Sequence, residues 1–154
     1  MKPRRVVLTL AVCFIGTTLC LAQQNLMGTW KLNEAKSKLA PGTAKNNTVV
    51  YESAGDSVKV TIDGTDAAGN PTHNEWTGKF DGRDYPVTGD PNSDSRSYDL
   101  RSAHKMGFKV KKEKKVTTTG TIIVSGDGKR RTVIASGTDA QGKKFKSTAV
   151  YDKQ

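Results

Sequence analysis

His73 and Glu75 are the side chains whose types and spacing come closest to a reactive group. They lie two residues apart, so they share one face of an extended strand. With Asp81 or Asp84 they would form a hydrolytic or metal-binding site. One histidine among carboxylates is a weak zinc site, because zinc usually recruits several His or Cys ligands. An outward-facing polar strand explains the pattern better, and His104 is predicted to be an isolated surface or turn residue.

A second candidate is the segment Asp90-Pro91-Asn92-Ser93-Asp94, which places oxygen ligands at the first, third and fifth positions of a calcium loop. The sixth position is Ser95 where Gly is needed, and the twelfth is Arg101 where a bidentate Glu is needed. These two residues exclude an EF-hand. An irregular calcium loop and a simple turn remain as alternatives, and the turn is favoured because Asp, Asn, Ser and Pro all form turns.

Other reactive motifs are missing from the sequence. It contains no Gly-x-Ser-x-Gly motif and no phosphate-binding loop, and Gly126-Asp127-Gly128-Lys129 is typical of a hairpin. Both cysteines, Cys13 and Cys20, fall within the first 22 residues, so residues 23–154 contain no thiol. We therefore expect no catalytic residues, no metal, no cofactor and no enzymatic activity. An enzyme that uses His73 and nearby carboxylates is the alternative.

The start of the chain is predicted to be a secretory signal. Its positive charges are Lys2, Arg4 and Arg5. A mainly apolar run over residues 6–21 follows, and small residues then favour cleavage after Ala22. A membrane anchor is less favoured because a span needs about 20 mainly apolar residues. A lipoprotein signal at Cys20 is disfavoured by the bulky Leu19. We expect residues 23–154 to be a single domain that is secreted or periplasmic.

Charge divides the remaining chain into two unequal parts. Residues 23–100 carry 8 Lys and Arg against 11 Asp and Glu, a balance of −3, whereas residues 101–154 carry 14 against 4, a balance of +10. A positive face built from the second part would attract an anionic membrane surface, a polyanion or an acidic ligand. Alternatively, these lysines are solvated and prevent strands from aggregating edge to edge. Nucleic acid is not expected as a partner, because the aromatic residues do not alternate with the basic ones as a stacking platform requires.

Alternating apolar residues indicate strands. Val58, Val60 and Ile62 point to one face of residues 57–64, and Val116 is expected to share a face with Ile122 in residues 116–124. Further strands are predicted at 48–52, 72–80, 108–111, 131–135 and 145–151. Two turns share the pattern Gly-Thr-Asp-Ala-x-Gly, at residues 64–69 and 137–142, which we interpret as the same hairpin chemistry. About eight to ten strands joined by hairpins predict an all-β sandwich or an antiparallel up-and-down barrel.

A short motif favours the barrel. Gly28 and Trp30 open the first strand after the predicted cleavage site, with Asn25 just before them. This Gly-x-Trp resembles the N-terminal signature of lipocalins and their calycin relatives. Together with residues 80–91, it also resembles exported bacterial lipocalin-like proteins of undefined function. The resemblance implies a barrel whose closed end is plugged by Trp30.

The resemblance also implies an arginine that stacks on the tryptophan from near the last strand. The last predicted strand instead offers Lys146 and Lys153, whereas Arg130 and Arg131 lie one strand earlier. One short helix is predicted, with Asn33 as its N-cap and Pro41-Gly42 as its stop.

We therefore expect a monomeric, lipocalin-like barrel that binds a small, largely apolar ligand, with an acidic head group as one option. Val124 is expected to face inward. The residues predicted to contact the ligand are Val58, Val60, Ile62, Trp76, Phe80, Phe108, Val110, Ile122 and Tyr151. The alternative is a solidly packed interaction module that docks its basic face onto an anionic envelope component.

Overall fold

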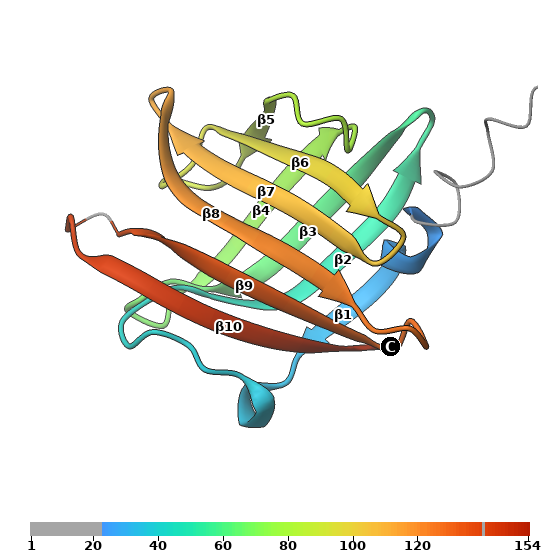
Figure 1. Cartoon of the computed structure of the whole chain (residues 1–154). Coiled ribbons are helices and arrows are strands. Elements are labelled where there is room, and N and C mark those ends of the chain that lie inside the picture. The colour runs from blue at the N-terminus through green and yellow to red at the C-terminus, as the bar shows by residue number, and fades with distance from the viewer. Residues whose placement is uncertain (1–22, 140) are drawn as a thin grey trace, which may run out of the picture.

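The computed structural model describes residues 23–139 and 141–154, which form a closed barrel of ten antiparallel strands (Figure 1). Each strand pairs with its neighbours in sequence, and β1 closes the barrel by pairing with β10. The predicted all-β, up-and-down barrel is therefore confirmed. The predicted signal segment, residues 1–22, lies outside the described residues. The strands are β1 (Gly28–Leu32), β2 (Lys45–Ala54), β3 (Ser57–Thr65), β4 (Pro71–Gly78), β5 (Tyr85–Thr88), β6 (Ser95–Ser102), β7 (Lys105–Lys112), β8 (Lys115–Val124), β9 (Arg130–Thr138) and β10 (Lys144–Lys153).

The predicted alternation produces the core. Val58, Val60 and Ile62 of β3 are buried, and Trp76 of β4 lies opposite Val60 in the antiparallel register. Trp76 contacts the rings of Phe80, Tyr85 and Tyr98, and its indole N–H donates to the Arg96 carbonyl oxygen at 3.0 Å. The aromatic cluster thus ties β4 to β6 across the short strand β5.

The two similar turns use the same hydrogen bonds. One carboxylate oxygen of Asp66 accepts from the backbone N–H groups of Ala68 and Asn70. The equivalent oxygen of Asp139 accepts from the backbone N–H groups of Gln141 and Lys143. Both are local turns of the kind that Asp side chains favour. The turns of two hairpins at the same end of the barrel, β3–β4 and β9–β10, are therefore shaped alike.

One predicted face was wrong. Val116 does not share the inner face with Ile122, because its side chain is 50% exposed whereas Ile122 is 4% exposed. The register of β7 and β8 shifts, so that Thr118 pairs with Val110 while Val116 pairs with the adjacent Lys111. A bulge of this kind inserts Thr117 and reverses the direction of the side chains that precede it.

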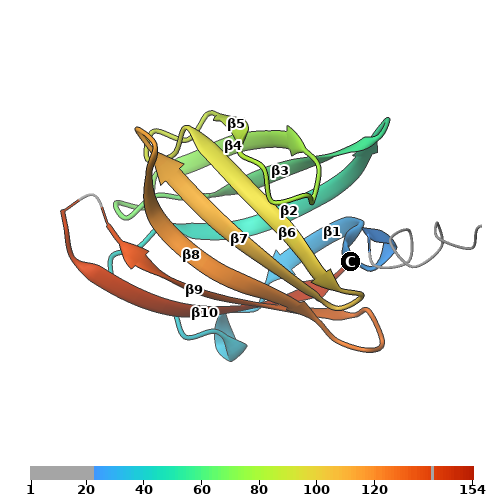
Figure 2. The same cartoon turned by 45° about the horizontal axis from the view of Figure 1, so that its top comes forward.

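The first residues close one end of the barrel. Residues 23–26 are helical, and Leu26 and Trp30 are both buried, Trp30 completely. The Trp30 indole N–H donates to the Leu26 carbonyl oxygen at 2.8 Å. Residues 23–26 and the C-terminus lie at the same end in both views (Figures 1 and 2). We call this the closed end.

The predicted short helix is present but shorter than expected. Asn33 caps a single 3-10 turn, η1 (Glu34–Lys36), by accepting from the Lys36 backbone N–H at 3.1 Å. The turn stops well before Pro41, because Lys38 forms a β-bridge with Thr148 of β10. Within the described residues, no helix has the length and apolar character that crossing a membrane requires.

Candidate functional site

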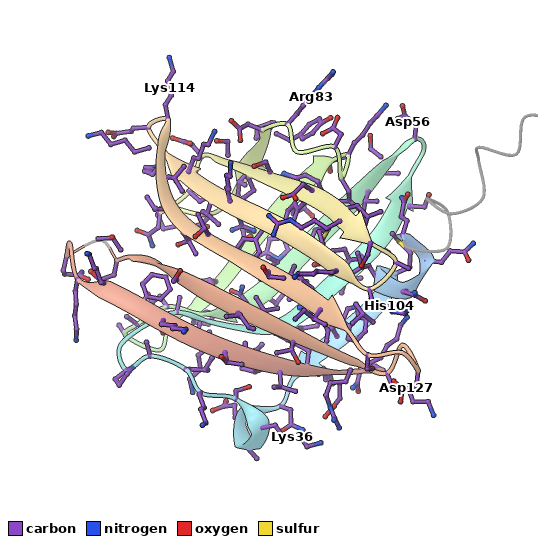
Figure 3. The ribbon with its side chains drawn as sticks, in the orientation of Figure 1. Lys36, Asp56, Arg83, His104, Lys114 and Asp127 are labelled. Atoms are coloured by element: carbon purple, nitrogen blue, oxygen red, sulfur yellow. The ribbon has the colours of Figure 1, made fainter. Side chains whose placement is uncertain are left out.

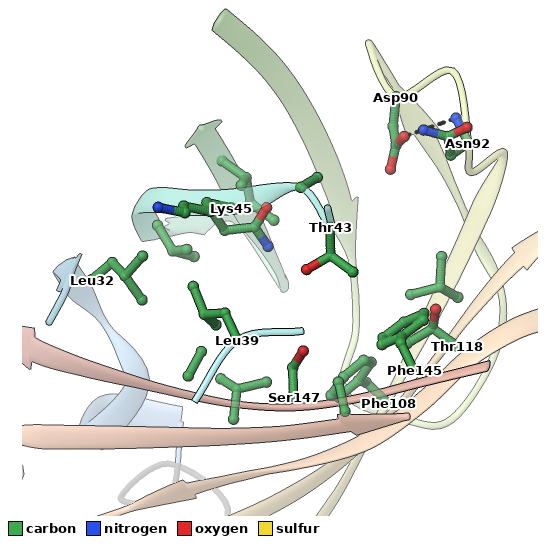
Figure 4. Close-up of a pocket in the computed structure, with 18 of the residues that line it drawn as sticks. Leu32, Leu39, Thr43, Lys45, Asp90, Asn92, Phe108, Thr118, Phe145 and Ser147 are labelled. Atoms are coloured by element: carbon green, nitrogen blue, oxygen red, sulfur yellow. Dashed lines mark hydrogen bonds between the residues drawn. The ribbon is translucent and has the colours of Figure 1, made fainter. Parts of the chain in front are cut away.

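A cavity of about 570 Å³ occupies the barrel interior (Figure 4). It is lined by inward-facing residues of β1–β3 and β6–β10, and by loop residues 42–44, 66–68, 90 and 92. These loops lie at the end opposite residues 23–26, which we call the open end. The closed end carries the hairpin tips at Asp56, His104 and Asp127, whereas Lys114 lies at the open end (Figure 3). The cavity therefore extends from the open-end loops into the interior.

The wall is largely apolar. Phe108 of β7 and Phe145 of β10 project into the part of the cavity shown in Figure 4, with Leu32 and Leu39 also on its wall. Phe108 packs over Gly120, where an added Cβ atom would come within 2.5 Å of the ring. The glycine thus provides the room that the Phe108 ring occupies on the cavity wall.

Arg131 lines the deep part of the cavity and is 2% exposed. Its guanidinium carbon lies 4.3 Å from the Tyr151 ring centroid, 5.3 Å from that of Tyr51 and 5.5 Å from that of Trp30. Its Nη1 donates to the Tyr51 hydroxyl at 2.8 Å, while its Nε has no hydrogen-bond partner. The expected arginine on the tryptophan therefore comes from β9.

Two buried phenols surround this guanidinium. Burial raises the pKa of Tyr51 to about 12, although the positive charge of Arg131 opposes the shift. Burial likewise raises the pKa of Tyr151, again against the effect of Arg131. Both hydroxyl groups are consequently protonated at neutral pH and can donate hydrogen bonds.

A second arginine lines the cavity and is neutralised. Arg96 is 7% exposed, and its Nη2 donates to a carboxylate oxygen of Asp90 at 2.7 Å. The other oxygen of Asp90 accepts from the Asn92 backbone N–H, and Asp94 accepts from that of Glu113. Donors of the protein, two of them from outside the loop, thus bind the carboxylates of the candidate calcium loop. Among residues 23–139 and 141–154, no three His, Cys, Asp or Glu side chains gather as a metal site.

His73 lies outside the cavity. Its ring is hydrogen-bonded to Asp63 at 2.7 Å, its other nitrogen lies 3.8 Å from Glu75, and its side chain is 59% exposed. The hydrogen bond to Asp63 is the main reason why its pKa is raised. Asp81 and Asp84, the predicted partners of His73, instead accept from Tyr85 and Lys111. The structure does not bring these carboxylates to the histidine.

The predicted ligand-contacting residues fall into two groups. Those that line the cavity are Ile62, Phe108, Val110, Ile122 and Tyr151. Val58, Val60 and Trp76 are buried in the core and do not line it, and Phe80 stacks on Trp76. Val124, also expected to face inward, is buried. Alternation predicts direction but not depth, so it does not separate cavity wall from packed core.

The residues predicted from the sequence to contact the ligand did not include the arginines of the cavity or Tyr51 and Tyr98. Arg131 shares the inner face of β9 with Val133 and Ala135, so the alternation of that strand already placed it inside. Arg96 and Tyr98 lie on β6, whose sequence SRSYDLRS has too few apolar residues to reveal a strand. Tyr51 continues the inner face of Val49 on β2. A strict count of alternate positions would have found Arg131 and Tyr51.

No family model matches the sequence, and no curated protein matches it. Two similar solved structures are a redesigned β-barrel and a structure of EF1p2_mFAP2b bound to DFHBI. The first is 14% identical, with a TM-score of 0.48, over 90% of this chain and 99% of that chain. The second is 11% identical, with a TM-score of 0.49, over 86% of this chain and 97% of that chain. Likeness at this level carries no inference about a ligand.

Proposed function

We propose that this protein is a lipocalin-like carrier that binds a small, largely apolar ligand inside its barrel, outside the cytoplasm. The cavity of about 570 Å³ is the observation that supports the proposal. Small-molecule sites typically measure about 300–1,000 Å³ and combine apolar walls with a few polar groups. A barrel that served only as a solid module would have side chains in this space.

A cavity-filling substitution tests binding. N-phenyl-1-naphthylamine, a neutral apolar fluorophore, is titrated into the wild type and into Ala135→Phe. Ala135 lines the cavity, so a phenyl group there occupies ligand space. Ile134→Phe is the matched control, because Ile134 directly precedes Ala135 in β9 and is 37% exposed on the outer surface.

We expect the wild type and Ile134→Phe to bind the fluorophore with similar affinity. The affinity of the Ala135→Phe variant for the fluorophore should fall by about tenfold, equivalent to about 1.4 kcal/mol. Equal affinity in all three proteins would place the fluorophore on the outer surface and contradict the carrier. Absence of binding to the wild type would contradict it as well.

The location outside the cytoplasm is tested separately. The pattern of the first 22 residues supports export and cleavage after Ala22. Full-length protein expressed in a Gram-negative host is recovered from the periplasm and its N-terminus is determined. A start at Gln23 is expected, whereas a product that begins at Met1 in the cytoplasm or membrane would contradict export.

The basic outer surface supports a second candidate, association with an anionic envelope surface. The strands that carry most of the lysines, β7 to β10, are neighbours in the barrel. Lys109, Lys115, Lys144 and Lys146 are exposed, and none of them forms an ion pair with another described residue. Co-sedimentation with phosphatidylglycerol vesicles at low salt, reversed by added salt, is the expected result. Equal sedimentation with neutral phosphatidylcholine vesicles would contradict it.

A further inference from the structure

The charge of Arg131 is not explained by an apolar cavity. A guanidinium removed from water needs an opposite charge or a full set of hydrogen bonds, because a lone buried ion is costly. Arg131 is 2% exposed, and its Nε has no hydrogen-bond partner. The ion pairs of neighbouring arginines join Arg96 to Asp90 and Arg130 to Asp152, and none among the described residues joins Arg131 to a carboxylate.

Its neighbours supply only part of what the guanidinium lacks. Three aromatic rings, those of Trp30, Tyr51 and Tyr151, face the cation within 5.5 Å of its carbon atom. Aromatic faces attract a cation but do not neutralise it. The hydroxyl of Tyr51 accepts one hydrogen bond, and a guanidinium carries five N–H donors. The site therefore has spare donors and a net positive charge.

The other cavity arginine differs in having a carboxylate partner in the same interior. Arg96 is also buried, at 7% exposed, and its Nε likewise has no hydrogen-bond partner, but Asp90 accepts from its Nη2 at 2.7 Å. Both side chains line the same cavity. The chain thus supplies a carboxylate to one of its two cavity arginines and leaves the other without one.

The geometry points to Arg131 as the anchor for the carboxylate of the ligand, with the Tyr51 and Tyr151 hydroxyls as neighbouring donors. The fork of a guanidinium matches the two oxygens of a carboxylate. This inference rests on the proposed carrier function and names its ligand class: monocarboxylic acids with an elongated apolar body. The protonated state of both phenols, which follows from their raised pKa values, agrees with this role.

The position of Arg131 also sets the direction of the ligand. Arg131 pairs with Tyr151, whereas Phe145 pairs with Gly137 near the opposite end of β9. These positions are six residues apart, or about 20 Å along the strand. An acid bound at Arg131 would therefore enter carboxylate first and leave its apolar body beside Phe145 and Phe108, towards the open-end loops.

The test compares an acid with its neutral ester. The probes are 11-(dansylamino)undecanoic acid and its methyl ester, titrated into the wild type, Arg131→Gln and Lys153→Gln. Lys153 is a matched control because its ammonium also lies over the Trp30 ring, at 5.2 Å, yet it does not line the cavity. N-phenyl-1-naphthylamine binding by each variant checks that the cavity is intact.

We expect the wild type and Lys153→Gln to bind the acid about tenfold more tightly than the ester. Arg131→Gln should lose this preference while it binds the ester and N-phenyl-1-naphthylamine as the wild type does. Equal affinity of the wild type for acid and ester would overturn the inference while the carrier function stands. No binding of either dansyl probe or of N-phenyl-1-naphthylamine would overturn both.

A measurement on the wild type covers the case in which Arg131→Gln does not fold. Dodecanoic acid labelled with ¹³C at the carboxyl carbon is bound to the protein and followed by NMR as the pH is lowered. A carboxylate held by Arg131 should titrate at a pH well below that of the free acid. A bound acid that titrates at or above the free value would overturn the inference.

Discussion

The guanidinium of Arg131 lies over the ring of Trp30, with its carbon atom 5.5 Å from the ring centroid. Trp30 belongs to β1 and Arg131 to β9, so the contact joins strands that are separated by β10. Trp30 faces the N-terminal residues through its hydrogen bond to Leu26, whereas Arg131 lines the cavity. The pair therefore separates the plug of the closed end from the interior space.

Trp30→Ala should strongly destabilise the barrel. The side chain is completely buried and its indole N–H is hydrogen-bonded. Removal of a buried tryptophan typically lowers the free energy of unfolding by about 3–5 kcal/mol. Urea unfolding followed by far-UV circular dichroism measures the change. Val116→Ala, at the 50% exposed position of β8, is the control and should stay within about 0.5 kcal/mol of the wild type.

Gly120→Ala should destabilise the barrel although it adds only one methyl group. The new Cβ atom would lie 2.3 Å from the Ile134 carbonyl oxygen and 2.5 Å from the Phe108 ring. Overpacking of this kind costs about 1–3 kcal/mol. Gly126→Ala is the matched control, because nothing lies within 4 Å of the added atom. Similar urea midpoints for the two variants would show that the Phe108 ring is not held against the strand.

These residues show how far the sequence could predict the structure. Strands β3 and β9 follow from alternation, because in each strand less exposed side chains alternate with more exposed ones. The bulge at Thr117 could not be predicted, because it is set by the register of two strands and not by any one residue. The cavity could not be predicted from the sequence for a related reason. Val60 and Val110 look alike in sequence, and only closure of the barrel makes one core and the other wall.

Stability should fall in alkali in a way that depends on Tyr51. Its pKa is raised from 10.0 to about 12, chiefly by burial. Between these values the unfolded chain has released the proton while the folded chain retains it, so the free energy of unfolding falls as pH rises. At pH 11, about one pH unit above the ordinary pKa of tyrosine, the loss should be on the order of 1 kcal/mol. Urea unfolding at pH 9 and pH 11 measures the loss.

Tyr51→Phe supplies the comparison, because phenylalanine has no proton to release. The variant should lose less stability between the two pH values than the wild type does. The residual loss includes Tyr151, whose pKa is also raised by burial. A loss as large in Tyr51→Phe as in the wild type would show that the Tyr51 hydroxyl ionises as freely in the folded protein as in the unfolded chain.

Paired substitutions at Arg131 and Tyr51 should show that the barrel itself does not need the cation. Arg131→Met keeps an apolar stem but removes the donor of the 2.8 Å hydrogen bond to Tyr51. The orphaned hydroxyl should lower the free energy of unfolding by about 1–3 kcal/mol. Adding Tyr51→Phe removes that hydroxyl too, and replacement of both partners by apolar groups is often nearly neutral.

We therefore expect the double variant to be at least as stable as Arg131→Met alone, measured by urea unfolding at pH 7. A double variant whose loss equals the sum of the two single losses would make the cation a structural requirement of the closed end. If stability is retained while the preference for an acid over its ester disappears, the same side chain is dispensable for folding and required for recognition. A costly buried charge would then be explained by the ligand it holds.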